Sequence, residues 1–173
     1  MIEMQVYPTH GSGTKIMYGD MKEDFKHLKF HPDTDWHEYE IEWTPDYIQF
    51  KIDNEMVRRE EGNEFVRNQR KAQNVIMSFQ TPEWDSKNLD ESQLPAYTKY
   101  DWVKVWKYNE SNGGFNMLFT DNFQTLDDKR WLVHHDFSFP GNTSKYMNTH
   151  TYVDEGKLVL KLDNKLTPPT PKP

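Results

Sequence analysis

Apolar and polar residues alternate along much of the chain, and this period of two predicts short β-strands rather than helices. Two alternating runs, residues 38–43 and 47–52, flank a Thr-Pro-Asp turn. Each run should place one row of side chains in the core and the other in water. An Asp-Asn pair at residues 53–54 then predicts a hairpin turn, with residues 56–59 as the returning strand. This part of the chain therefore predicts three antiparallel strands.

The same pattern predicts three further strands, at residues 74–79, 100–108 and 156–162. The middle one alternates along its length and is expected to be a half-buried antiparallel strand. No helical period of ten or more residues is present. Residues 60–70 predict a loop or a single helical turn, and residues 85–95 a loop.

These elements predict an all-β fold, an antiparallel β-sandwich of two packed sheets. Trp43 and Phe50 fall on apolar rows, and we expect both to pack in the core. Two breaks interrupt the strands. A Gly-rich segment at residues 109–114 predicts a flexible joint, and residues 165–173 form a Pro-rich tail that is either a linker stub or a frayed end.

Composition narrows the possible functions. The chain has 173 residues, 28 acidic and 21 basic side chains and a net charge of −7, so nucleic acid is disfavoured as a partner. There is no cysteine, which excludes disulfides and thiolate metal sites, and no apolar run is long enough to span a membrane. We expect no signal peptide in this chain, because its start is neither basic nor apolar. The aromatic share of 14% is typical of domains that bind sugars.

Several motifs resemble glycoside hydrolase family 16. Residues 36–48 read W-H-E-Y-E-I-E-W-T-P-D-Y-I, and residues 100–106 look like the closing strand of that family. Residues 119–131 look like its opening segment, and residues 156–160 like an early strand. The opening segment therefore follows the closing strand, an order that resembles the circularly permuted 1,3-1,4-β-glucanases (lichenases) of the family.

The resemblance implies a concanavalin-like jelly roll that is circularly permuted and lacks its N-terminal strands. Residues 1–108 would then form the C-terminal part of the sandwich and residues 115–164 its permuted N-terminal part, joined by residues 109–114. The missing strands would belong to a longer protein, come from a partner chain, or be replaced by self-association.

The catalytic strand of the family carries E-x-D-x-E, with a nucleophile first and an acid/base last. The matching residues here are Met1, Glu3 and Gln5. A thioether cannot form the glycosyl ester, and an amide cannot protonate a leaving oxygen. Glu3 could still titrate, although a lone carboxylate on a sheet is more often structural. The resemblance thus implies remnant catalytic positions that are not competent.

Substrate-binding candidates follow from the same resemblance. They are Phe137, for sugar stacking or simple packing, Asn142 on a family asparagine, and Trp84 on a loosely aligned loop. An Asn-x-Trp pair of the family cleft is replaced by residues 78–80, Ser-Phe-Gln, so that a stacking ring is lost. The adjacent His134 and His135 should face opposite ways and not share a metal.

A structural Ca²⁺ site of the family maps to Asp101, Gly156 and Asn122, although Asp101 could instead cap or pair at a strand edge. No catalytic cofactor is implied.

The resemblance implies an inactive domain that binds β-glucan or serves as a structural or interaction module. The alternative is a retaining endo-1,3-1,4-β-glucanase whose catalytic strand is truncated or mutated. Either would be extracellular or on the cell surface.

Overall fold

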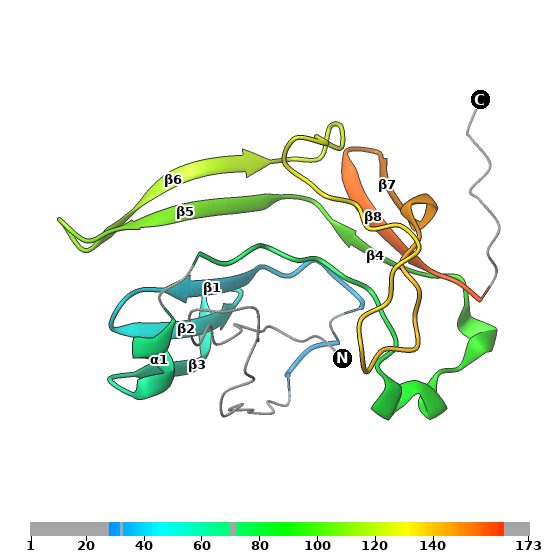
Figure 1. Cartoon of the computed structure of the whole chain (residues 1–173), viewed down its shortest axis with the longest axis horizontal. Coiled ribbons are helices and arrows are strands. Elements are labelled where there is room, and N and C mark those ends of the chain that lie inside the picture. Colours follow the sequence, from blue (N-terminus) through cyan, green and yellow to red (C-terminus); the bar gives the residue numbers. More distant parts are fainter. Residues whose placement is uncertain (1–27, 32, 70–71, 165–173) are drawn as a thin grey trace. The chain divides into compact units, whose positions relative to one another are not determined.

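The computed structural model describes residues 28–31, 33–69 and 72–164 (Figure 1). The chain divides into two compact units, Met1–Asn74 and Val75–Pro173, and each is described by itself. The segment 1–5, with Met1, Glu3 and Gln5, and the Pro-rich tail from residue 165 lie outside the described residues.

The first unit is a three-stranded antiparallel sheet with the order β1-β2-β3. Its strands are β1 (Tyr39–Trp43), β2 (Tyr47–Ile52) and β3 (Glu55–Glu61), and a short helix, α1 (Glu64–Asn68), follows them. The predicted hairpins are therefore confirmed. Asp53 and Asn54 have φ of 50° and 65°, the left-handed conformation that a tight two-residue hairpin turn requires and that these residue types tolerate.

The core of this unit lies on the apolar row of the strands. Ile48 and Phe50 of β2 are buried with Val66 of α1, and Trp43 packs against them, whereas Ile41 on the apolar row of the edge strand β1 is 43% exposed. The helical turn predicted as one alternative for residues 60–70 is α1. It begins at its cap Asn63, whose side chain accepts a hydrogen bond from the Val66 amide at 3.1 Å.

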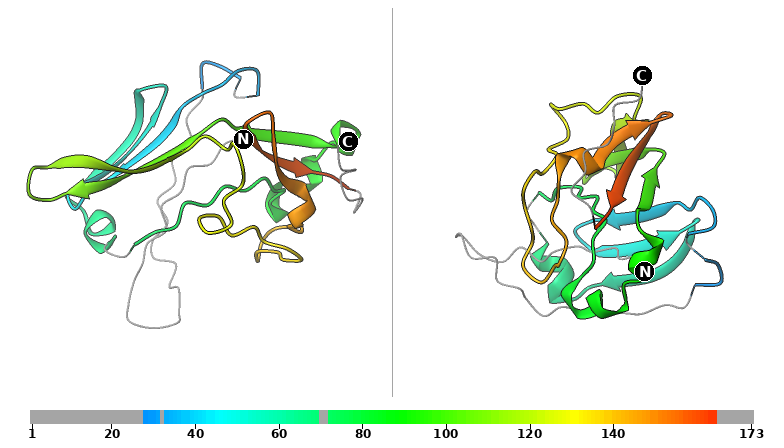
Figure 2. Two further views of the ribbon diagram at one scale, coloured as in Figure 1. Left: turned by 90° about the horizontal axis from the view of Figure 1, so that it is seen from above. Right: turned by 90° about the vertical axis from the view of Figure 1, so that its right-hand side faces the viewer.

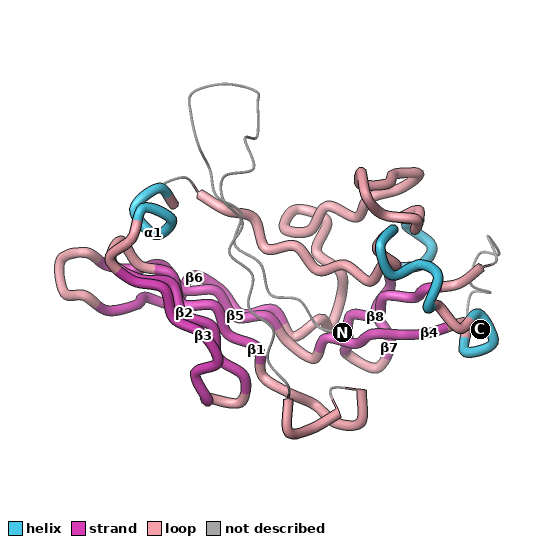
Figure 3. Tube along the Cα trace, turned by 90° about the horizontal axis from the view of Figure 1, so that it is seen from below, coloured by secondary structure: helices cyan, strands magenta, loops and turns pink. Residues whose placement is uncertain are grey.

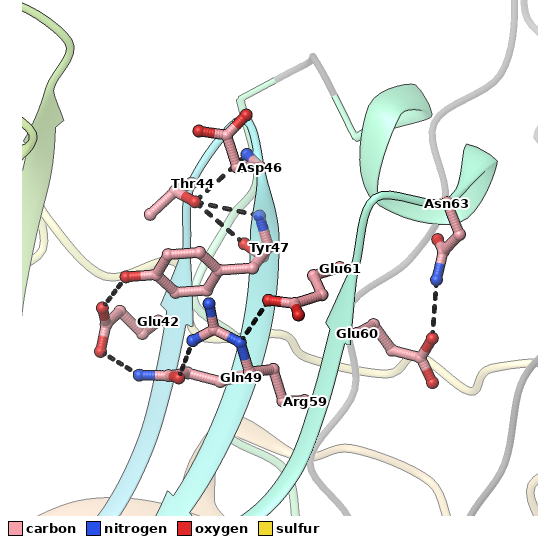
Figure 4. A network of polar contacts seen from close by, with 9 residues as sticks. All are labelled: Glu42, Thr44, Asp46, Tyr47, Gln49, Arg59, Glu60, Glu61 and Asn63. Atoms are coloured by element: carbon pink, nitrogen blue, oxygen red, sulfur yellow. Dashed lines mark hydrogen bonds and ion pairs between the residues drawn. The ribbon is translucent and has the colours of Figure 1, made fainter.

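The opposite row of the same sheet carries a polar network (Figure 4). The Glu42 carboxylate accepts hydrogen bonds from the Tyr47 hydroxyl, from Gln49 Nε2 at 2.6 Å and from Lys51 Nζ at 2.9 Å. Arg59 donates to Gln49 Oε1 at 2.6 Å and lies over the Tyr47 ring. Burial alone would raise the pKa of Glu42, but the donated hydrogen bonds outweigh it and lower that pKa. The network fixes this face of the sheet.

The second unit contains a sheet with the order β4-β8-β7 and a separate hairpin, β5-β6. The strands are β4 (Ala96–Tyr100), β5 (Val103–Asn109), β6 (Gly114–Asp121), β7 (Thr151–Asp154) and β8 (Lys157–Leu162). All their pairings are antiparallel (Figure 2). Short 3₁₀ turns cover Glu83–Asn88, Glu91–Gln93 and Asn148–His150, and a long loop connects β6 to the last of them (Figure 3). The all-β, antiparallel class is thus confirmed.

Two predicted strands need correction. Residues 74–79 form no ladder with the described residues, although Met77 and Phe79 pack against a core of Phe123, Leu158 and Leu160. Alternation records only which side chains are buried, whereas a strand also needs a partner with free backbone groups. The predicted strand 100–108 is broken at residues 101–102, and a bulge between Val105 and Trp106 interrupts its alternation.

Two segments predicted as a loop and as a flexible joint have regular structure. Residues 85–95, predicted as a loop, carry most of two 3₁₀ turns. The Gly-rich segment 109–114 is the turn of the β5-β6 hairpin, where Asn109 pairs with Gly114 and Gly113 has φ of +68°. Positive φ costs glycine little, which explains its place in this turn. Among the described residues, no helix is long and apolar enough to cross a membrane.

Candidate functional site

Aromatic rings gather in a loop of the second unit. The Phe137 ring stacks on His134 with centroids 4.9 Å apart, meets the edge of Phe139 at 4.9 Å and lies 6.4 Å from Tyr146. Phe137 and Tyr146 also form a two-residue β-bridge, with amide-to-carbonyl distances of 3.4 and 2.7 Å. Phe137 and Phe139 remain 37% and 40% exposed. The loop therefore leaves part of both rings exposed to solvent on a backbone that is held in place.

A polar group adjoins these rings. Asn142 Nδ2 donates to Gln80 Oε1 at 3.0 Å and to the Tyr146 hydroxyl oxygen at 3.2 Å. The Tyr146 hydroxyl in turn donates to Gln80 Oε1. Asn142 Oδ1 accepts from the Ser144 amide at 2.8 Å, which orients the whole side chain. The predicted residues Phe137 and Asn142 thus come together through Tyr146.

Two segments far apart in the sequence hold this cluster in place. The Thr81 amide donates to Ser144 Oγ at 2.8 Å, and the Thr143 amide donates to the Thr81 carbonyl at 3.0 Å. Pro82 and Asn142 form a second β-bridge. The cluster of Gln80, Phe137, Phe139, Asn142 and Tyr146 is called the aromatic-amide cluster below.

Trp84 lies beside this cluster along the chain but makes none of its ring contacts. It is 69% exposed, on the 3₁₀ turn Glu83–Asn88. The amide of its neighbour Glu83 donates to the Gly141 carbonyl at 2.9 Å, next to Asn142. The ring is therefore free to meet a ligand near the cluster, while it contributes little to the core.

Sequence reasoning missed Tyr146 and Phe139 and treated Gln80 only as the loss of a ring. Tyr146 lies in an irregular loop, where no alternation or spacing marks it. The available signal was the Phe-Ser-Phe alternation at residues 137–139, which suggests two rings on one side of an extended segment.

Charged groups at the edge of the cluster pair with each other. Lys145 forms an ion pair with Asp136, and this hydrogen bond holds the pKa of Asp136 below its usual range. His134 stacks on Phe137, whereas His135 Nδ1 accepts from the Asn148 amide at 3.4 Å, so the two histidines face different partners. The described groups at this cluster are suited to binding a polar ligand with flat faces, because they offer rings and oriented amides.

Asn122 and Gly156, two of the three predicted calcium residues, both lie close to the side-chain amide of Gln124. The Asn122 carbonyl accepts from Gln124 Nε2 at 3.4 Å, and a Cβ at Gly156 would lie 3.0 Å from the same nitrogen. Asp101 Oδ1 lies 4.0 Å from Nζ of Lys157, which follows Gly156. No group of three or more His, Cys, Asp or Glu side chains in the described ranges could hold a metal. A calcium ion here would therefore depend on backbone carbonyls, which suit that ion.

Comparison with known proteins places the chain in a family. The sequence model described as "Glycosyl hydrolases family 16" matches residues 2–104. A protein named "Beta-glucanase" from Fibrobacter succinogenes is 35% identical over 156 residues, which cover 85% of this chain and 44% of the relative. The chain thus spans less than half the length of that relative. Because the family model matches more than half of its residues, the chain belongs to glycoside hydrolase family 16.

Proposed function

We propose that this chain is a β-glucan-binding domain of family 16 that does not hydrolyse its ligand. One observation carries the proposal, which is the amide Gln5 at the position of the acid/base. Without a proton donor the departing sugar leaves as an alkoxide, and general acid catalysis is typically worth ~10²–10⁴-fold. Met1 at the nucleophile position removes the second group that a retaining mechanism needs.

The aromatic-amide cluster supports a role in binding. A glucose unit in a β-linked chain has flat apolar faces and a rim of hydroxyls. Phe137 and Phe139 offer partly exposed rings for such a face. Gln80 and Asn142 offer amide groups for the rim. These features need no carboxylate pair, so binding can persist when catalysis has been lost.

The test compares binding and turnover in the same preparation. The 173-residue chain is incubated with lichenan and laminarin for a reducing-sugar assay, and its migration is followed in native gels that contain either polymer. We expect retardation in at least one gel and no release of reducing ends. Turnover of either polymer would contradict the loss of catalysis. The absence of retardation would instead favour a structural or protein-interaction role.

The alternative function is a retaining endo-1,3-1,4-β-glucanase whose catalytic strand is altered here. The similarity to a protein named β-glucanase favours it. A double variant, Met1→Glu with Gln5→Glu, separates the two cases. If only the two carboxyls are missing, the variant should release reducing ends from lichenan, while Gln5→Glu alone should not. If the rest of the site is also lost, neither variant will act.

We also propose a structural calcium ion held by Asp101, Asn122 and Gly156. The Asn122 carbonyl and Gly156 both lie close to the Gln124 amide, and Asp101 lies 4.0 Å from the ammonium of Lys157, the residue after Gly156, which supports placing the three residues in one region. The ion would bring together the turn before β8 and the ends of β4 and β6. The measurement is the melting temperature in calcium and in EDTA, where a calcium-dependent rise is expected.

The order of the segments supports a circular permutation. The family match ends at residue 104, within β5. The similarity to the Fibrobacter protein covers 85% of this chain, more than residues 1–104 can supply, so it continues past the β5-β6 turn. Asn109 and Gly114 pair across that turn, so the natural ends of an unpermuted chain would lie side by side there.

The proposal also covers where the domain is located and whether it associates with another chain. A β-glucan is an extracellular polymer, so we place the domain outside the cell or on its surface. Apolar side chains on the β5-β6 hairpin are exposed, among them Trp106, Met117 and Leu118 at 44%, 52% and 59%. Self-association or a partner chain would cover them. Light scattering at several concentrations measures this, and a monomer at all concentrations would exclude self-association.

A further inference from the structure

Gln80 occupies an unusual place in the aromatic-amide cluster. The residues before it alternate between the core and solvent, since Met77 and Phe79 pack inward while Ser78 and Gln80 are exposed. Gln80 therefore points away from the core, toward Asn142 and Tyr146. By the family resemblance, Gln80 stands at the position of the Trp in the Asn-x-Trp pair. A hydrogen-bonding amide therefore takes the place of a stacking ring in this chain.

The hydrogen bonds fix which way the Gln80 amide faces. Its Oε1 accepts from both Asn142 Nδ2 and the Tyr146 hydroxyl. The Asn142 Nδ2 group can only donate, and the Tyr146 hydroxyl already accepts from it and uses its own hydrogen to donate, so both contacts select the carbonyl oxygen of the amide. No described residue accepts a hydrogen bond from Gln80 Nε2. Because the carbonyl oxygen of Gln80 is held by two partners, the two N–H groups of the same amide point to solvent.

The partners of Gln80 are themselves oriented. Asn142 is set by the hydrogen bond from the Ser144 amide to its Oδ1 at 2.8 Å. Tyr146 is set by its backbone bridge to Phe137, with a distance of 2.7 Å from its amide to the Phe137 carbonyl. Each step fixes the next, and the amide nitrogen is preorganised before any ligand arrives. Preorganisation lowers the entropic cost of binding, because the donor is already ordered in the free protein.

We infer that Gln80 is a specificity-determining residue of the β-glucan site, where Nε2 donates a hydrogen bond to an oxygen of a glucose unit held near Phe137. The inference rests on the proposed binding of β-glucan. A stacking ring tolerates many orientations of a sugar, whereas a fixed N–H donor demands an acceptor in one direction. Gln80 would therefore make binding depend on the position of a glucan oxygen.

The experiment measures the affinity of the full chain for a 1,3-1,4-β-linked glucose tetrasaccharide by titration calorimetry. Gln80→Met keeps the length of the side chain and removes its donors. Tyr146→Phe keeps Gln80 and the ring but removes one of the groups that orient the amide. Gln93→Met is the matched control, because Gln93 is an exposed glutamine that bonds to Asp90 outside the cluster. Circular dichroism verifies the fold of each variant.

Gln80→Met should weaken binding roughly threefold to tenfold, the effect of one neutral hydrogen bond. Tyr146→Phe should weaken it by a smaller factor, and Gln93→Met should leave it unchanged. Binding of both cluster variants within twofold of the unchanged chain would overturn the role of Gln80 alone. Failure of the unchanged chain to bind any glucan would instead overturn the proposed function, and this inference with it.

Discussion

Asp121 ends β6, and its replacement should be costly although it lies outside the aromatic-amide cluster. The residue is 7% exposed, and its carboxylate accepts three hydrogen bonds. Phe123 N donates to Oδ1 at 2.9 Å, while Trp131 Nε1 and Arg130 Nη1 donate to Oδ2 at 2.7 and 3.0 Å. The carboxylate therefore connects the end of a strand to the loop that returns over it.

The magnitude follows from what Asp121→Ala leaves behind. The amide of Phe123, a fully buried residue, and the indole N–H of Trp131 would lose their acceptor, at about 1–3 kcal/mol each. The Arg130 side chain is about one-third exposed, so its ion pair adds at most ~1 kcal/mol. We expect the free energy of unfolding to fall by about 3 kcal/mol, a large part of the stability of a domain.

The assay is urea unfolding followed by tryptophan fluorescence. Asp128→Ala is the control, because Asp128 is exposed on the same loop, and its effect should stay within about 0.5 kcal/mol. Asp121→Asn should cost less than Asp121→Ala, since its amide oxygen still accepts. A loss below about 1 kcal/mol for Asp121→Ala would refute the reasoning, because it would mean that water or other groups satisfy these donors.

The pH dependence gives an independent measure of the same residue. Burial would raise the pKa of Asp121, but the hydrogen bonds from Trp131, Phe123 and Arg130 outweigh it and lower that pKa. A lowered folded-state pKa stabilises the fold above the ordinary aspartate value of about 3.8. The gain is lost as the pH falls through the folded value. The stability difference from Asp121→Asn should shrink over that acidic range.

Three further predictions address other parts of the molecule. Glu42→Gln should destabilise the first unit by about 1–2 kcal/mol in urea unfolding, because the Lys51 ammonium, whose pKa is raised to about 12 by its hydrogen bonds to Glu40 and Glu42, loses the less exposed of these two carboxylates. Phe137→Ala should weaken retardation in β-glucan gels at least about threefold, through the loss of a partly exposed aromatic ring. Gly156→Ala should lower stability by about 1–2 kcal/mol, since φ there is +70°, and should abolish any calcium-dependent rise in melting temperature. Equal melting curves with and without calcium in the unchanged chain would contradict the calcium proposal.

Local sequence signals located the elements whose partners are near in the chain. Alternation in residues 38–52, together with the Asp53-Asn54 turn, predicted the β1-β2-β3 sheet because each strand pairs with its neighbour. The same signal placed Met77 and Phe79 inside but wrongly implied a paired strand. It also ran through residues 101–102, where the chain leaves one strand and begins another. Alternation in the local sequence indicates which side chains are buried, but it does not indicate whether another strand is available to pair with the segment.

By itself the sequence determined the all-β class, the hairpins of β1, β2 and β3 and the family, because these depend on turn chemistry, period and motif. Phe137 and Asn142 came from the family resemblance, and the structure brought them together. Only the tertiary structure decided that Gln80 meets Asn142 and Tyr146, which are 62 and 66 residues away along the chain. No periodicity encodes a contact at that separation. It forms because two loop segments share backbone hydrogen bonds, and those bonds exist only once the second unit has folded.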